Sequence, residues 1–212
     1  MRMPVLETDR LVVRPFVVDD LPAVHDLLDV QLGNAEVGTE GALSLAQRER
    51  WLRWTVEGYD GFAYLRQPPY GDRAVALRDT GQLVGACGYV PCLGPFDQLP
   101  ALAVGGSSSR LWSPEFGLYW SILPSYQRRG FATEAGRLLV DWAFSVLHLR
   151  RIVAMTSYDN TASIRVMEKL GMRIERNPLP DPPWFQVVGF VTNPGSVDAA
   201  PPLMQEEHPP DR

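Results

Sequence analysis

Between residues 116 and 146 a strand is followed almost at once by the clearest helix of the chain, and no other feature constrains the fold as strongly. Residues 116–123 are apolar and aromatic and end at a proline, which is typical of a strand. Apolar side chains then recur at i, i+3, i+4 and i+7 across residues 135–146, with Glu134 in the first turn of this helix. A strand that leads into an amphipathic helix predicts a sheet with helices packed against it.

The remaining segments extend this pattern. We expect further strands over residues 11–16, 73–77, 83–89, 151–156 and 185–191, and further helices over residues 19–28, 43–56 and 160–170. Residues 79–82 carry a turn glycine between two of these strands, which predicts a hairpin. The resulting order, β-α-α-β-β-β-α-β-α-β, mixes hairpins with crossover helices. The fold class is therefore α/β or α+β with a mixed sheet.

The length of the chain fits one domain followed by a tail. A chain of 212 residues is long enough to bury a sizeable core. We expect this domain to span residues 5–192. Residues 193–212 are expected to form a disordered, Pro-rich and acidic tail, because the final 16 residues contain four prolines and no apolar periodicity.

A long irregular segment interrupts the pattern at residues 91–114. It is rich in Pro, Gly and Ser, and a structureless loop of this length is uncommon outside lids, binding loops and disordered segments. It also carries four large apolar side chains, Phe96, Leu99, Leu102 and Trp112. We expect this loop to line or cover the substrate site, or to form a contact in a homodimer.

Composition excludes several classes of function. The formal net charge of -5 argues against a nucleic-acid partner, since proteins that neutralise phosphates usually carry a basic excess. No apolar run approaches the ~18–20 residues of a membrane helix, and the first residues contain no signal-peptide core, so we expect a cytoplasmic protein with no membrane partner. The two cysteines suit a reducing compartment, and the three histidines are scattered, so no metal site is expected. Lys169 is the single lysine among 20 basic residues, an arginine excess typical of a GC-rich genome, and we expect a bacterial protein.

The segment between the strand and the helix, residues 124–134, suits an anion. The first backbone N–H groups of a helix have no partner within it, and the helix dipole favours a negative charge there. Gly130 has no Cβ, so a phosphate can approach the main chain closely. Arg128 and Arg129 add positive charge. The segment is therefore able to hold a diphosphate, although an isolated arginine pair of this kind more often belongs to a plain strand–turn–helix.

Four segments together resemble the GNAT N-acetyltransferase superfamily. Residues 127–132 match its Q/R-x-x-G-x-G/A signature, and residues 130–135 match its G-Y/F-A-T-E-A variant. Residues 7–15 resemble the opening of the branch related to the ribosomal-protein N-terminal (alanine/serine) acetyltransferases. Residues 160–172 resemble its N-x-x-S-x-x-x-x-E-K-x-G-F/M segment. The resemblance implies the GNAT fold, in which a mixed, mostly antiparallel sheet with flanking helices is splayed between two strands to form an acetyl-CoA groove.

The resemblance also implies acetyl-CoA as co-substrate and no metal. Backbone groups of residues 128–133 would hold its pyrophosphate, and the backbone of residues 120–122 would pair with the pantetheine as another strand does. Asn160 would hold the pantetheine arm, and it is also a plausible helix N-cap. The expected cofactor-binding residues are Trp120, Ser121, Ile122, Gln127, Arg128, Arg129, Gly130, Phe131, Ala132, Thr133 and Asn160.

Acetyl transfer needs a neutral amine, and the class of amine decides how much help the enzyme must give. An α-amine with a pKa of about 7.8 is on the order of 15% neutral at pH 7, whereas a lysine ε-amine at about 10.4 is roughly 0.04% neutral. Proximity would therefore supply much of the rate for N-terminal acceptors. Glu115 is the expected base, because the related branch carries a Glu at the start of this strand. Here Glu115 precedes the proline by nine residues rather than the usual seven, which moves it about 6.6–6.8 Å along the strand and leaves its depth open.

The proton donor to the leaving thiolate is less clear, because the residue that many family members use is absent. Those enzymes carry a tyrosine in the helix over residues 160–170, where this chain has Met167. Ser163 is the expected acid, with Tyr158 and Tyr119 as weaker candidates. If no acid is needed, Asn160 or a helix N-terminus would help the thiolate to leave.

These features predict an acetyl-CoA-dependent N-acetyltransferase. The acetyl group would pass to a primary amine by direct attack in a ternary complex, and the acceptor would be either a protein N-terminal α-amine or a small-molecule amine. The alternative is a non-catalytic acyl-CoA-binding or interaction domain on the same scaffold. The missing tyrosine and the displaced Glu115 keep that alternative open.

Overall fold

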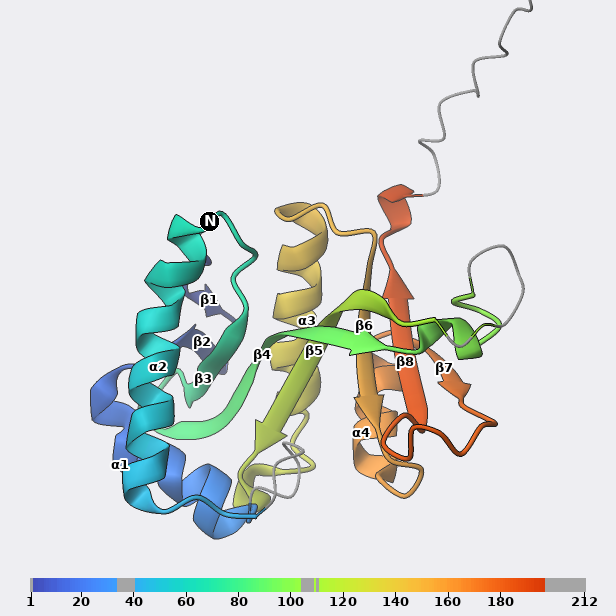
Figure 1. The fold of residues 1–212 in the computed structure, drawn as a ribbon. Coiled ribbons are helices and arrows are strands. Elements are labelled where there is room, and N and C mark those ends of the chain that lie inside the picture. Colours follow the sequence, from blue (N-terminus) through green and yellow to red (C-terminus); the bar gives the residue numbers. More distant parts are fainter. Residues whose placement is uncertain (1, 34–40, 104–108, 110, 197–212) are drawn as a thin grey trace, which may run out of the picture.

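An eight-stranded sheet with helices on both faces organises the molecule (Figure 1). The computed structural model describes residues 2–33, 41–103, 109 and 111–196. The strands follow the order β1-β2-β3-β4-β5-β6-β8-β7. Every neighbouring pair is antiparallel except β5 and β6, which are parallel. The predicted mixed sheet, mostly antiparallel, is thus confirmed.

The helices and strands agree closely with those expected from the sequence. The strands are β1 (Leu6–Glu7), β2 (Leu11–Pro15), β3 (Gly71–Leu77), β4 (Leu83–Gly94), β5 (Ser113–Ile122), β6 (Arg151–Thr156), β7 (Arg173–Arg176) and β8 (Val187–Thr192). The helices are α1 (Leu21–His25), which continues as a π-helix (Asp26–Gln31), α2 (Leu45–Tyr64), α3 (Phe131–Ser145) and α4 (Thr161–Lys169). The sequence did not predict β1 and β7, which are the two edge strands and are too short or too charged to show a strand pattern.

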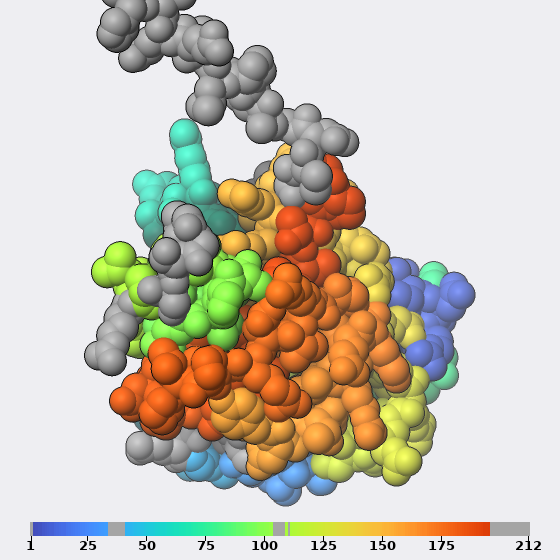
Figure 2. All heavy atoms as spheres, turned by 90° about the vertical axis from the view of Figure 1, so that its right-hand side faces the viewer, coloured from blue at the N-terminus to red at the C-terminus, as the bar shows by residue number. Residues whose placement is uncertain are grey.

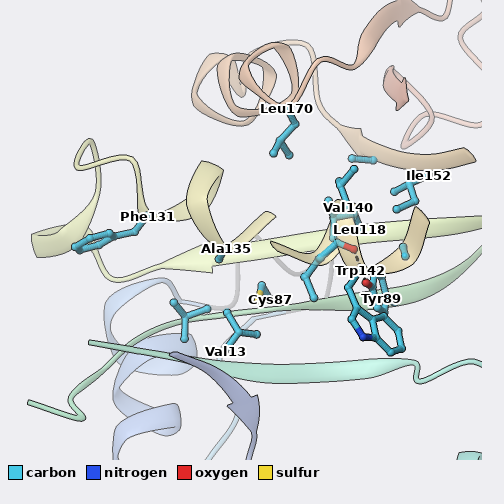
Figure 3. Close-up of a cluster of buried hydrophobic side chains, with 14 of the residues drawn as sticks. Val13, Cys87, Tyr89, Leu118, Phe131, Ala135, Val140, Trp142, Ile152 and Leu170 are labelled. Carbon is cyan, nitrogen blue, oxygen red and sulfur yellow. Dashed lines mark hydrogen bonds between the residues drawn. The ribbon is translucent and has the colours of Figure 1, made fainter. Parts of the chain in front are cut away.

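The face of the sheet under α3 holds the main hydrophobic core (Figure 3). Tyr89 of β4 is fully buried there, and its hydroxyl donates a hydrogen bond to the carbonyl oxygen of Leu139 in α3 at 2.5 Å. The Tyr89 ring also packs on Phe116 and Trp142, with centroids 4.9 and 6.3 Å apart. These contacts fix α3 against the central strands, so the N-terminus of α3 has a defined position beside the end of β5.

The helices α1 and α2 cover the opposite face of the sheet, over β2, β3 and β4. Phe16 and Leu52 are buried between these layers. Asp29 and Arg48 form a buried ion pair that ties the π-helix to α2, with Nε to Oδ2 at 2.7 Å and Nη2 to Oδ1 at 2.8 Å. Burial alone would raise the pKa of Asp29, but hydrogen bonds from Arg48 and from the N–H of Leu43 bring it below its ordinary value. The pair is therefore charged in the native state near neutral pH.

The segment predicted to be an irregular loop over residues 91–114 is regular at both ends, so that prediction was wrong there. β4 continues to Gly94 and β5 begins at Ser113, and the two strands pair from Gly85↔Ile122 to Gly94↔Ser113. Beyond Tyr89, β4 has left β3 and pairs with β5 alone. A proline at position 91 is compatible with such a one-sided strand, which explains why the Pro and Gly content misled the sequence analysis. Residues 104–108 and 110 lie outside the described part of the chain.

The apolar side chains of this segment pack against the sheet. Phe96, Leu99 and Leu102 are buried together with Phe185 near β6 and β8. The amide of Asn177 donates to the side-chain oxygen of Gln98 at 2.9 Å, which joins the segment to the stretch before β8. Figure 2 shows the two stretches, green and orange-red, side by side on the surface. These side chains serve as core, and the prediction of a homodimer contact stays a prediction.

The parallel strands β5 and β6 separate almost as soon as they meet. In the described residues they pair at one position, Gly117↔Val153. A Cβ on Gly117 would lie 2.2 Å from Sγ of Cys92 and 2.8 Å from the carbonyl oxygen of Val90, so glycine is needed for β4 and β5 to approach here. After this point residues 118–122 run without a strand partner on the β6 side. This is the splay that the family resemblance implied.

Candidate active site

The N-terminus of α3 opens into the splay beside β5. Gly130 is the N-cap of α3 and has a left-handed backbone, with φ at 86°. Arg128 also has a positive φ, 63°. The first intrahelical hydrogen bond runs from the N–H of Glu134 to the carbonyl oxygen of Gly130 at 2.9 Å, which leaves the N–H groups of residues 131–133 without a partner inside the helix. Backbone amides arranged around left-handed residues form a concave site for anions.

Thr8 and Arg10, in the N-terminal segment of the chain, hold the start of α3 in place through hydrogen bonds. Arg10 Nε donates to Oε2 of Glu134 at 2.9 Å, and the hydroxyl of Thr8 donates to the other carboxylate oxygen. Arg10 also donates to the carbonyl oxygen of Arg129 at 3.3 Å, and its guanidinium lies 4.8 Å above the ring of Phe131. The sequence analysis did not assign Arg10 to the site. The available signal was that Arg10 and Glu134 both lie in segments that resemble the family.

A cleft of about 350 Å³, the first cleft, runs from the N-terminus of α3 between β5 and α4. Nine of the eleven predicted cofactor-binding residues line it, namely Trp120, Ile122, Gln127, Arg128, Gly130, Phe131, Ala132, Thr133 and Asn160. The sequence analysis missed its further lining residues Tyr126, Ala162, Arg165, Val166 and Lys169.

Two predicted cofactor residues do not line the first cleft. Ser121 is 1% exposed, and within the described residues its hydroxyl has no hydrogen-bond partner. Arg129 is exposed, and its guanidinium lies 4.9 Å above the ring of Tyr126. The roles predicted for both residues involve backbone groups and stay predictions.

Asn160 and Ser163 stand where α4 begins. The side-chain oxygen of Asn160 accepts a hydrogen bond from the N–H of Ser163 at 3.0 Å, so Asn160 is the N-cap of α4. Both residues line the first cleft and also a second one. Capping α4 therefore places both side chains between two cavities.

The second cleft has a volume of about 530 Å³ and shares Trp120, Asn160 and Ser163 with the first. We call these three shared residues the junction. The rest of the second cleft is lined by Asp72, Val90, Pro91, Cys92, Leu93, Leu118, Tyr119, Ala154, Met155 and Thr156. Residues 91–93 belong to the segment that was expected to line a site, and this part of it does line a cleft.

Glu115, the predicted base, lies outside both clefts. Its carboxylate accepts hydrogen bonds from Nε of Arg151, at 2.8 Å, and from Nη2, and its side chain is 7% exposed. Glu115 precedes Trp120 of the junction by five residues, roughly 16–17 Å along a strand. A carboxylate that is held in a two-pronged ion pair this far along the strand is badly placed to take a proton from an amine at the junction. The geometry therefore counts against Glu115 as the base.

The structure distinguishes the candidates for the proton donor to the leaving thiolate. Met167 is 1% exposed and packs so closely that a Cβ on Gly189 would lie 2.9 Å from its Sδ, so it belongs to the core. The hydroxyl of Tyr158 donates to the carbonyl oxygen of Asn177. Tyr119 lines the second cleft, its hydroxyl has no partner in the described part of the chain, and burial raises its pKa well above the ordinary value. Ser163 thus lines both clefts, whereas Tyr119 lines the second cleft with its hydroxyl buried.

None of the helices in the described residues is both long enough and apolar enough to cross a membrane. No group of three or more His, Cys, Asp or Glu side chains in those residues is arranged to hold a metal ion.

The sequence and the fold of the chain are similar to those of known acetyltransferases. Residues 10–173 match the acetyltransferase (GNAT) domain family. The chain is 31% identical over 173 residues to the uncharacterized N-acetyltransferase YoaA of Bacillus subtilis, which covers 81% of this chain and 84% of YoaA. The fold resembles ribosomal-protein-S5-alanine acetyltransferase from Vibrio fischeri, with a TM-score of 0.63 at 16% identity over 91% of this chain and 98% of that one. It also resembles AAC(6')-Ib, solved with ribostamycin and coenzyme A, with a TM-score of 0.60 at 18% identity over 87% and 94% of the two chains. At these identities the two structures support the fold alone.

Proposed function

The chain belongs to the GNAT family of N-acetyltransferases, and from this premise we propose that it transfers the acetyl group of acetyl-CoA to a primary amine at the junction. One observation carries the proposal: two clefts share Trp120, Asn160 and Ser163, and the first of them begins at the N-terminus of α3, which is suited to a diphosphate. A thioester that extends from the first cleft would end where the second begins. The second cleft would then hold the acceptor.

The lining of the first cleft fits coenzyme A in charge and shape. The backbone of residues 128–133 would hold the pyrophosphate, and a Cβ at position 130 would intrude on that cradle. Arg128, Arg165 and Lys169 place three positive side chains along the cleft, which suits a ligand with several phosphate charges. Bound acetyl-CoA would supply an acetyl group already activated as a thioester.

Direct transfer to the amine is favoured over an acyl-enzyme. A thiol nucleophile must ionise, yet burial raises the pKa of Cys87 to about 12 and that of Cys92 to about 11. Ser163 would hydrogen-bond the departing sulfur as it gains charge, and Asn160 would hold the pantetheine arm beside it. We propose that residues 5–192 form the domain that carries out this reaction.

The test is release of coenzyme A thiol from acetyl-CoA with three acceptors. These are a peptide with a free N-terminal alanine, the same peptide with a blocked N-terminus and one lysine, and the small amine spermidine. We expect thiol release with at least one of them, together with a product heavier by one acetyl group in mass spectrometry. The α-amine and small-amine arms separate the two acceptor types. If acetyl-CoA stabilises the protein but no amine raises thiol release above background, the chain is a binding domain and the proposal is wrong.

A further inference from the structure

Asp72, the second residue of β3, lines the second cleft, and no role described so far accounts for a carboxylate there. Its side chain is half-buried. The hydroxyl of Tyr59 donates to the backbone oxygen of Asp72, but within the described residues the carboxylate itself has no hydrogen bond or ion pair. Unpaired carboxylates are rarely withdrawn from water without a function.

The register of three strands places Asp72 close to the junction. Asp72 pairs with Gly88 of β4, and Gly88 pairs with Tyr119 of β5, so the three residues form one row. A Cβ on Gly88 would lie 2.2 Å from the carbonyl oxygen of Gly71, so glycine lets the start of β3 come close over β4. Tyr119 is followed by Trp120 of the junction. Neighbouring strands are about 4.8 Å apart, so the backbone of Asp72 lies roughly 9–10 Å from that of Tyr119, with the side-chain-free Gly88 between them.

The surroundings of Asp72 keep its carboxylate basic. Burial raises the pKa of Asp72 to about 6, and the positive charge of Arg48 on α2 opposes this only in part. Arg48 is already paired with Asp29. Of the other titratable groups in this region, Tyr59 of α2, Cys87 of β4 and Tyr119 of β5 have raised pKa values and are neutral near pH 7. Arg73, the next residue of β3, is buried and remains positively charged, although burial lowers its pKa. A base whose pKa lies just below the working pH is ionised and still accepts a proton readily.

No second carboxylate competes with Asp72 among the described residues of the two clefts. Of the described residues that line either cleft, it is the one carboxylate. Glu115 lies outside both clefts and is held by Arg151. A positively charged amine that enters the second cleft therefore meets one negative group among the described lining residues.

We propose that Asp72 is the general base of acetyl transfer, and that it receives the acceptor as a primary ammonium ion. The ammonium gives one proton to the Asp72 carboxylate, and the neutral amine attacks the thioester carbonyl carbon with its freed electron pair. The new C–N bond forms, the C–S bond breaks, and the sulfur leaves with that bond's electron pair. The second proton of the attacking nitrogen passes to the sulfur, which gives the amide and coenzyme A thiol. Asp72 then returns its proton to solvent.

This inference rests on the proposed function and is tested with whichever amine of the three-acceptor assay is acetylated. Asp72→Asn keeps the size of the side chain but cannot take the proton. We expect kcat/KM at pH 7 to fall by about 100-fold or more, in the range that a lost general base produces. Asp79→Asn is the matched control, because it removes the same charge from an exposed turn, and we expect wild-type kinetics. Asp72→Glu should retain more activity than Asp72→Asn.

The pH profile separates a base from a residue that only supports the fold. Wild-type kcat/KM should rise through a pH of about 6 as Asp72 loses its proton, and then level off. In Asp72→Asn the rise should move to the pKa of the amine itself, about 7.8 for an α-amine, so the defect should shrink by pH 9. The increase in melting temperature caused by coenzyme A should be the same in both proteins.

The outcomes are distinguishable. If wild type acetylates an amine and Asp72→Asn matches it at pH 7 with the same pH profile, Asp72 is not the base although the proposed function stands. A loss of equal size at every pH, together with a weaker effect of coenzyme A on melting, would make Asp72 a structural residue and overturn the inference. If wild type acetylates none of the amines, the proposed function fails and the inference with it.

Discussion

Replacing Gly130 is expected to affect both the stability of the protein and its binding of coenzyme A. Its φ of 86° lies in the left-handed region, and a Cβ there would meet only the end of Arg10, at 3.6 Å. Gly130→Ala therefore introduces no serious clash within the protein. It does force a non-glycine residue into the left-handed region, at about 1–2 kcal/mol. For a chain of this size that lowers the melting temperature of the free protein by about 2–8 °C.

The effect on coenzyme A should be larger than the effect on the fold. With coenzyme A at about 100 times its wild-type Kd, binding stabilises the wild type by about 2.7 kcal/mol, or about 5–11 °C. The added Cβ should hold the pyrophosphate away from the amides of α3. Losing one or two hydrogen bonds to a charged group, taken as about 2.7 kcal/mol in total, weakens binding about 100-fold. At the same coenzyme A concentration the variant would then gain only about 0.4 kcal/mol.

Differential scanning fluorimetry with and without coenzyme A measures both quantities, and Gly81→Ala is the matched control. Gly81 also has a left-handed backbone, with φ at 70° and open space around it, but it lies in the β3–β4 turn. We expect Gly81→Ala to lose a similar amount of stability and to keep the full shift with coenzyme A. The reasoning is refuted if Gly130→Ala keeps the full shift, or if Gly81→Ala loses it as well.

Three further predictions concern the supports of the site and the fold. Asn160→Ala removes the N-cap of α4 and should cost about 1 kcal/mol of stability in urea unfolding, while isothermal titration shows weaker coenzyme A binding; unchanged values in both would contradict the assignment. Gly117→Ala places a Cβ 2.2 Å from Sγ of Cys92, and should destabilise by about 1–3 kcal/mol in urea unfolding, a cost that wild-type unfolding would disprove. The lowered pKa of Asp29 beside Arg48 means that the stability from this pair is complete above the unfolded pKa of about 3.9 and is lost as pH falls through the lower folded value. Acid unfolding followed by circular dichroism should therefore lose a stabilising component in Asp29→Asn, and identical acid profiles would contradict it.

The sequence predicted those parts of the fold whose pattern is local. α3, α4 and β6 follow from apolar periodicity and strand composition, and the turn before α3 follows from a glycine placed before a helix. The edge strands β1 and β7 were not predicted because runs of two and four residues are too short to show the alternation of apolar and polar side chains that marks a strand. The extension of β4 past Pro91 was not predicted because it depends on β3 beginning only at Gly71, opposite Tyr89, and a pairing with another strand is not visible in the local pattern.

The same division holds for the candidate site. Most of the predicted cofactor residues between Gln127 and Thr133 line the first cleft, because one turn and one helix start bring them together. The position of a base is harder to predict, because it depends on register across several strands. Glu115 stands in the expected strand, but β6 brings Arg151 against it. Asp72 reaches the second cleft through the pairing of β3 with β4, and no spacing within the sequence reveals that pairing.

The central claim is that the thioester lies where the two clefts meet, and a crystal structure of the protein with acetyl-CoA tests it most directly. The account predicts the pyrophosphate against the amides of residues 128–133 at the start of α3. It also predicts the thioester sulfur at Trp120, Asn160 and Ser163, with the acetyl group facing the second cleft. A pyrophosphate bound elsewhere, or a sulfur that lies away from this junction, would contradict it.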